Sequence, residues 1–320
     1  MKKTGLLLLL AAGLACAQTS PTSTVTAQPD ASGIVPTSVS VPFVRYQTPT
    51  ASDVYCAGFI AKSRVADANY VTGGLETPTS TKFEYPELVF LHGTGYQVGQ
   101  LYSIVRELQD INEYEIYPGM RKLLSAAGHP YSEVGRVRVV DMRSKEAIAQ
   151  VEFSCDAINP GDVAVPFVQR DPVTFHVPGH FDRFAPANGK LSGRIVLAKD
   201  FDLVLGTGAT VYLNVGSNQG VKPGDYFRVM RSYGSMLQNP IDALTFMAQT
   251  SEDTQARPPV FEGNFLTRSK GPNIHVGDMP KRAVGEVVVL STTPTSSAAM
   301  LVFSFEDVYA GDNVELDQQD

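Results

Sequence analysis

Val284-Gly285-Glu286-Val287-Val288-Val289 resembles Val134-Gly135-Arg136-Val137-Arg138-Val139, which lies 150 residues earlier in the chain. The same offset of 150 relates two later pairs, Phe153-Ser154 with Phe303-Ser304 and Gly161-Asp162 with Gly311-Asp312. Chance can supply one such pair, but three pairs in the same order and at one spacing indicate a duplicated unit. The repeat therefore decides how the rest of the sequence is divided.

Earlier blocks extend the match toward the N-terminus with smaller offsets. They are Cys56–Ile60 with Leu191–Ile195 at an offset of 135, Val89–His92 with Val211–Asn214 at 122, and Gly99–Arg106 with Gly224–Arg231 at 125. We therefore predict a first β module at 50–170, a linker at 171–189, a second β module at 190–316 and a tail at 317–320.

Each module has the pattern of short β-strands. Runs rich in β-branched and aromatic residues, such as Val211–Val215 and Tyr226–Met230, alternate with Gly and Pro turns. Such spacing predicts an all-β fold of two tandem, small, barrel-like modules, in which closure protects the strand edges. Short helical insertions are expected at 118–128 and 239–249. Because the modules differ most at these insertions, we expect any specific binding surface to lie there.

The turns carry their own signature. In Lys222-Pro223-Gly224-Asp225, Pro presets φ at the second position and Gly supplies the positive φ that a type II turn requires at the third. The repeated Asp residues are expected to accept hydrogen bonds from turn amides. The residues assigned to structural turns are Pro160, Gly161, Asp162, Pro223, Gly224, Asp225, Gly311 and Asp312.

The N-terminus has the pattern of an export signal. Two lysines precede an apolar run of about ten residues, too short to span a bilayer, and small residues follow it, which predicts a signal peptide at 1–17. We favour cleavage after Ala17. The alternative is a lipoprotein, because Gly13-Leu14-Ala15-Cys16 resembles a lipobox in which Cys16 is acylated, with Gly13 where that motif usually carries Leu. Residues 18–49 are rich in Ser, Thr and Pro and are expected to be a disordered linker.

Composition and cysteine content limit the function classes. The chain has 320 residues and a formal net charge of −7, without a basic cluster, which argues against nucleic acid as a partner. Nothing after the signal is long and apolar enough for a transmembrane helix, so membrane contact is expected only if Cys16 is lipidated.

Export implies an oxidising compartment, and we predict a disulfide between Cys56 and Cys155. Their counterparts in the repeat, Leu191 and Phe305, are apolar. Two buried free thiols are the alternative.

We find no motif that predicts catalytic, cofactor-binding or metal-binding residues. The spacing of His176 and His180 is suggestive, but Pro178 and Gly179 keep the pair off one helical face. No nucleophile elbow is present. We therefore expect a non-enzymatic protein without a cofactor.

The stretch Val211–Arg231, continued by Val284–Leu290 and Gly311-Asp312, resembles the C-terminal β module of the flagellar assembly protein T family and related envelope-assembly barrels. The opening Tyr55–Ile60 is similar to uncharacterised exported acidobacterial proteins, some of which carry LysM domains, although no LysM motif is present here. The resemblance implies an exported, periplasmic or outer-membrane-associated structural or adaptor protein of the cell envelope, with envelope proteins or peptidoglycan as partners.

Two other function classes stay open. One is a peptidoglycan- or glycan-binding module that uses exposed aromatic side chains as stacking platforms. The candidates are Tyr96, Phe184 and Tyr233. The other is a hydrolase with an unrecognised site, which a pocket grouping His176 or His180 with carboxylates would favour.

Overall fold

A computed structural model describes residues 46–109, 115–117, 119–175, 181–231 and 281–317, together with the backbone of 254–255 and 274–275. The described residues all belong to one compact unit that spans 43–320. The expected signal peptide, Cys16, His176, His180, Tyr233 and the expected helix at 239–249 lie outside the described residues.

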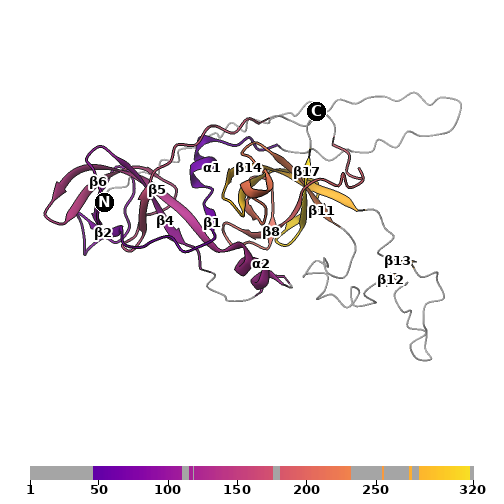
Figure 1. The fold of residues 1–320 in the computed structure, drawn as a ribbon, viewed down its shortest axis with the longest axis horizontal. Coiled ribbons are helices and arrows are strands. Elements are labelled where there is room, and N and C mark those ends of the chain that lie inside the picture. The colour runs from indigo at the N-terminus through magenta and orange to yellow at the C-terminus, as the bar shows by residue number, and fades with distance from the viewer. Residues whose placement is uncertain are drawn as a thin grey trace, which may run out of the picture. The chain divides into compact units, whose positions relative to one another are not determined.

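The described elements are mostly strands (Figure 1). The first half contains α1 Ala51–Cys56, β1 Phe59–Ala61, β2 Tyr70–Gly74, β3 Leu88–His92, β4 Leu101–Glu107, α2 Met120–Ala127, β5 His129–Arg143, β6 Glu146–Ser154 and β7 Val163–Pro166. The second half contains β8 Ser192–Ala198, β9 Val204–Leu205, β10 Thr210–Leu213, the 3-10 helix η1 Ser217–Gln219, β11 Tyr226–Arg231, β12 Thr254–Gln255, β13 Ile274–His275, β14 Arg282–Thr292, β15 Ser297–Ser304, β16 Val308–Tyr309 and β17 Asn313–Asp317.

The strands form two closed antiparallel barrels of six strands each. In the first, the ring runs β2-β3-β6-β5-β4-β7 and back to β2. Strand β1 lies outside the ring and pairs with the start of β5. In the second, the ring runs β8-β10-β15-β14-β11-β17 and back to β8. Replacing each strand of the first ring by its counterpart in the second reproduces every pairing. The predicted all-β fold of two tandem barrel-like modules is therefore confirmed.

The strand registers repeat as well as the strand order. The β5–β6 pair is interrupted after Arg136 and after Val139, and the β14–β15 pair is interrupted 150 residues later, after Glu286 and Val289. Gly135 and Gly285 occupy equivalent positions, and a Cβ at either would lie 2.7 Å from the carbonyl oxygen of Phe153 or Phe303, respectively. Only glycine fits this approach of two strands, which explains why both copies keep it.

One expected block of the repeat is wrong. Cys56–Ile60 does not correspond to Leu191–Ile195, because Cys56 ends a helix and β1 lies outside the ring. The counterpart of β8 is β2: Leu91 pairs with Val71 as Leu213 pairs with Ile195, each next to a register shift. Gly73 and Gly74 stand where β8 has Leu197 and Ala198, which hid this match from the sequence.

Each barrel is filled by its own apolar core. Buried Val, Leu and Ile side chains line the second barrel together with Phe227, and a similar cluster with Phe83 fills the first. Successive residues of a strand face opposite sides, so the neighbours of core residues lie on the outer face. On β11, Phe227 and Val229 belong to the core, and Arg228 and Met230 therefore face outward.

A third apolar cluster joins the two modules. Val54, Ala57 and Ile60 pack with Val196, Tyr212, Met300 and other residues of the second barrel. The buried Tyr212 hydroxyl donates to the Ala57 carbonyl at 2.9 Å, and the Ser296 hydroxyl donates to the Ile60 carbonyl at 3.1 Å. Because α1 and β1 contribute to this cluster, the segment that precedes the first ring acts as part of the joint between modules.

The predicted disulfide is confirmed. Cys56 and Cys155 are bonded, with their Cα atoms 5.6 Å apart, and the bridge ties the end of α1 to the residue after β6. Both cysteines are half-buried. The segment around Cys56 is a helix rather than the expected strand, because Thr50 and Asp53 form a reciprocal N-terminal cap. No described helix is long and apolar enough to cross a membrane.

Candidate functional site on the outer face of the second barrel

The end of each barrel carries the same Arg–Asp pair. Arg231 donates through Nε and Nη2 to the two carboxylate oxygens of Asp312, at 3.3 and 2.6 Å. Arg106 binds Asp162 in the same two-pronged way, at 2.8 and 2.7 Å. Both Asp side chains are buried, and the hydrogen bond from Arg106 to Asp162 contributes most to raising the pKa of that guanidinium. Each pair joins the end of one strand to the turn that precedes its neighbour.

The same aspartates close the turns in which the sequence places them. The Asp162 carboxylate accepts from the Asn159 amide at 2.7 Å, and Asp312 accepts from the Tyr309 amide at 2.8 Å. Gly161 and Gly311, at the third turn position, have φ of 93° and 99°. At the other turn of the second module, Asp225 accepts from the Lys222 amide at 2.8 Å. The Asp residues therefore act in turns, as proposed from the sequence.

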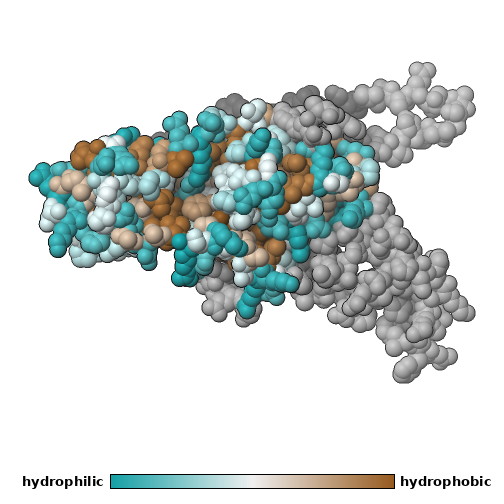
Figure 2. Space-filling model, in the orientation of Figure 1, coloured by the Kyte–Doolittle hydropathy of each residue, from teal (hydrophilic) through white to brown (hydrophobic). Residues whose placement is uncertain are grey.

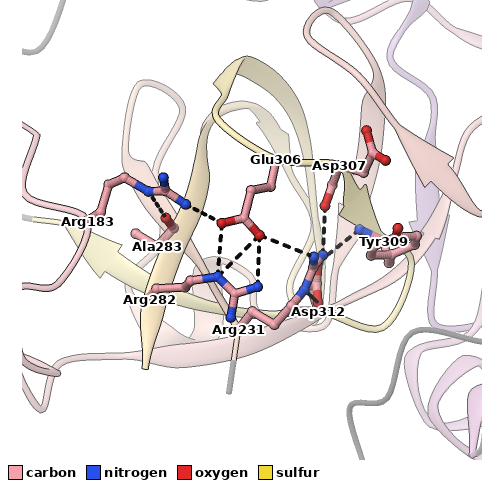
Figure 3. Close-up of polar contacts among 8 residues, drawn as sticks. All are labelled: Arg183, Arg231, Arg282, Ala283, Glu306, Asp307, Tyr309 and Asp312. Atoms are coloured by element: carbon pink, nitrogen blue, oxygen red, sulfur yellow. Dashed lines mark hydrogen bonds and ion pairs between the residues drawn. The ribbon is translucent and has the colours of Figure 1, made fainter. Parts of the chain in front are cut away.

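Near Arg231, further charged side chains gather around Glu306 (Figure 3). The Glu306 carboxylate lies between Arg183, from the segment that precedes the second barrel, and Arg282, the first residue of β14. Hydrogen bonds from Arg282 and the positive charge of both arginines lower the pKa of Glu306. The cluster fastens the approaching chain to the start of β14.

A second ionic group lies on the outer face of β11, β14 and β17. Arg228 donates to Glu315 at 3.1 Å and lies 3.8 Å from Asp317, and Glu286 occupies the paired position on β14. Residues 186–189 cover this face: Glu315 accepts from the amides of Asn188 and Gly189. Glu286 is 1% exposed, and its Oε2 atom has no hydrogen-bond partner within the described residues. Burial, aided by Asp317 and opposed by Arg228, raises its pKa from 4.5 to about 8.

Beside this ionic group, the structure has an open pocket of about 630 Å³. It is lined by residues of β8, β11 and β17, by residues between 187 and 190, and by Lys281. The charged and amide side chains of the lining are Lys190, Arg194, Asn214, Arg231, Lys281, Asn313 and Glu315. Four of these seven are cations, so the pocket offers a positive site on a chain whose net charge is −7.

The pocket lies where the second module's long insertion is joined to the barrel. Arg231 and Lys281 line the pocket and border residues 232–280 of the chain. The expectation that a specific binding surface lies at the insertions stays a prediction. The pocket residues themselves were not predicted, because Lys190 and Arg194 lie far from Lys281 in the sequence and the three form no motif.

Other residues that the sequence suggested have different positions. Tyr96, a candidate stacking platform, is buried and packs edge-on against Tyr102, 4.9 Å away between ring centroids. Phe184 is 59% exposed, as the stacking interpretation requires. In the described part of the chain, no three His, Cys, Asp or Glu side chains are grouped to hold a metal ion. Comparison of the sequence with protein-family models and with curated proteins found no match.

Proposed function

We propose that the protein is an exported, non-enzymatic structural or adaptor element of the cell envelope, located in the periplasm or at the outer membrane. The observation that carries the proposal is the joint between the modules, in which the apolar cluster and two buried hydroxyl bonds fix one barrel against the other. A joint of this kind suits a protein that presents two surfaces at a set separation. The disulfide between α1 and the first barrel supports the exported location.

The first insertion strengthens the same joint. The Tyr117 hydroxyl donates to the carbonyls of Ile195 and Val196, at 3.3 and 2.8 Å, and its ring packs against Gly311. Burial raises the pKa of this hydroxyl to about 12, so it remains a donor throughout the physiological range. Residues near α2 of the first module thereby bind β8 of the second, and contact between the modules extends beyond α1 and β1.

The alternative function, peptidoglycan or glycan binding, has one favourable observation. Phe184 and Tyr85 expose 59% and 66% of their surface and are available for stacking on a sugar ring. In Figure 2, hydrophobic residues appear as separate groups among hydrophilic ones on the face that is drawn. A sugar-binding role therefore rests on single aromatic side chains, and the adaptor role on the joint.

One experiment separates these functions. The full chain is incubated with purified peptidoglycan sacculi and, separately, cross-linked in intact envelopes before purification. An adaptor is expected to yield discrete cross-linked envelope proteins that are lost in Tyr212→Phe/Ser296→Ala, which removes both hydroxyl bonds of the joint, while Phe184→Ala has no effect. Retention on sacculi that Phe184→Ala abolishes favours glycan binding. Absence of specific cross-links contradicts the adaptor function.

A further inference from the structure

We propose that the pocket on the outer face of the second barrel binds an acidic peptide segment through its carboxylates. The proposal goes beyond the adaptor function and is independent of it, because it rests on the charges and donors of this pocket alone. The protein can be an adaptor without this binding site, and the site can bind a peptide in a protein that is not an adaptor.

Among the described residues, three of the four cations of the pocket have no acidic partner. Lys190, Arg194 and Lys281 have no carboxylate within 4.0 Å in the described part of the chain. Glu315, the acidic residue of the lining, is already engaged by Arg228 and by two backbone amides. Arg231 is likewise satisfied by Asp312. Three cations therefore remain to attract anions, and the carboxylates nearest to them are held by other partners.

Two donors of the pocket are fixed in position. Arg194 donates through Nε and Nη2 to the Gly311 carbonyl, and its guanidinium lies 5.3 Å from the centre of the Tyr117 ring. These contacts leave Nη1 as a donor to a ligand. Asn214 accepts from the Arg194 amide through Oδ1 at 2.7 Å, which leaves its amide NH₂ group as another donor. Because both side chains are already held in place without a ligand, binding a ligand costs them little conformational entropy.

The first barrel shows that the fold does not need these cations. It shares the Arg–Asp pair, whose task is structural in both copies. At the register positions of Arg194, Lys281 and Glu315, however, the first barrel has Tyr70, Tyr131 and Val165. A ring of the same topology thus closes without a basic pocket. The positive lining is a property of the second module alone, as expected for a binding site.

The size and lining of the pocket favour a peptide over a single small anion. A volume of about 630 Å³ lies within the range of ligand-sized sites and far exceeds one carboxylate or phosphate group. Lys190 and Lys281 both line the pocket and come from segments far apart in the sequence, so a ligand with two or more carboxylates can pair with both. Met230, Ala187 and the glycines of the lining contribute apolar surface for the aliphatic parts of such a ligand.

The test uses the full chain and a fluorescein-labelled hexapeptide of alternating Glu and Gly, with binding followed by fluorescence anisotropy. Lys190→Gln and Lys281→Gln are each expected to weaken binding about threefold, as for a partly exposed ion pair. Lys222→Gln removes an exposed lysine elsewhere in the same module and is expected to leave binding unchanged. Raising the salt concentration is expected to weaken binding by the wild-type protein.

Several results overturn the proposal. They are no binding by the wild-type protein, equal binding of a matched Gln–Gly hexapeptide, and unchanged affinity in the Lys190→Gln/Lys281→Gln double variant. Complete displacement by inorganic phosphate at a concentration equal to that of the peptide contradicts the peptide class and shows a general anion site. Unchanged circular dichroism confirms that each variant is folded, and Lys281→Glu, which reverses the charge of an exposed side chain, gives a second test if any variant misfolds.

Discussion

Replacing Glu286 by Gln tests whether a carboxyl group is buried uncharged in the second barrel. One guanidinium, Arg228, faces three acidic side chains, and it is bound to Glu315 and close to Asp317. The third acid, Glu286, is 1% exposed and its pKa is raised to about 8, chiefly by burial. At neutral pH it is therefore mostly protonated. Gln has nearly the same shape and cannot ionise.

The size of the effect follows from the two pKa values. Glu286 has a folded-state pKa of about 8 against the ordinary value of 4.5. Because the folded-state value is the higher one, folding favours the protonated form, and stability falls as pH rises from 4.5 toward 8. Each unit of difference between the two pKa values corresponds to about 1.4 kcal/mol of unfolding free energy. Titration of Glu286 is therefore expected to lower the unfolding free energy of the wild-type protein by roughly 4 kcal/mol between about pH 5 and 9. Glu286→Gln does not share that loss.

The assay is urea unfolding followed by far-ultraviolet circular dichroism, because the chain has no Trp. The stability of Glu286→Gln relative to wild type is expected to rise by roughly 4 kcal/mol between about pH 5 and 9. Groups that titrate alike in both proteins cancel in this difference. Glu76→Gln removes an exposed carboxylate and shows how much pH dependence the loss of a charge alone produces. A difference that stays constant over this range, or follows the control, refutes the reasoning.

Three further substitutions test the barrels themselves. Replacing both bridged cysteines by serine opens a loop that the disulfide closes over a separation of 99 residues. The chain-entropy model predicts a loss of about 4–5 kcal/mol in unfolding free energy, and a measured loss near zero contradicts that model. Arg231→Met leaves the buried Asp312 carboxylate unpaired and is expected to cost about 3–5 kcal/mol in urea unfolding, whereas an unchanged midpoint shows the pair to be dispensable. Gly285→Ala places a methyl group 2.7 Å from the Phe303 carbonyl oxygen and is expected to lower the melting temperature by an amount equivalent to about 1–3 kcal/mol. Gly206→Ala, where a Cβ meets nothing within 4 Å, is its control, and equal effects of the two substitutions contradict the steric account.

The sequence predicted the duplicated barrels because their closing strands keep one spacing. Gly135 and Gly285, and the turns at Gly161 and Gly311, are required by backbone geometry, so both copies preserve them. The opening strand was misplaced for the opposite reason. In β2, glycines replace the apolar residues that β8 carries, and the pattern of alternation is lost.

The charged site was less accessible to sequence reasoning. Arg106 and Arg231 end matching blocks, and their partners Asp162 and Asp312 also match, so the repeat contained the signal for this pair. What was missing was the order of strands in the ring, which places the end of β4 beside β7 and the end of β11 beside β17. The basic pocket left no such trace, since its lysines occur once and come from distant segments.

Both barrels have a long connection at the same place in the ring, between β4 and β5 in the first and between β11 and β14 in the second. The chain leaves the first ring after Glu107 and re-enters at His129, and it leaves the second after Arg231 and re-enters at Arg282. Stretches of very different length thus share one attachment point without disturbing closure. We therefore expect this connection to accept added sequence, such as a tag, provided that the contacts of Tyr117 in the first connection are kept.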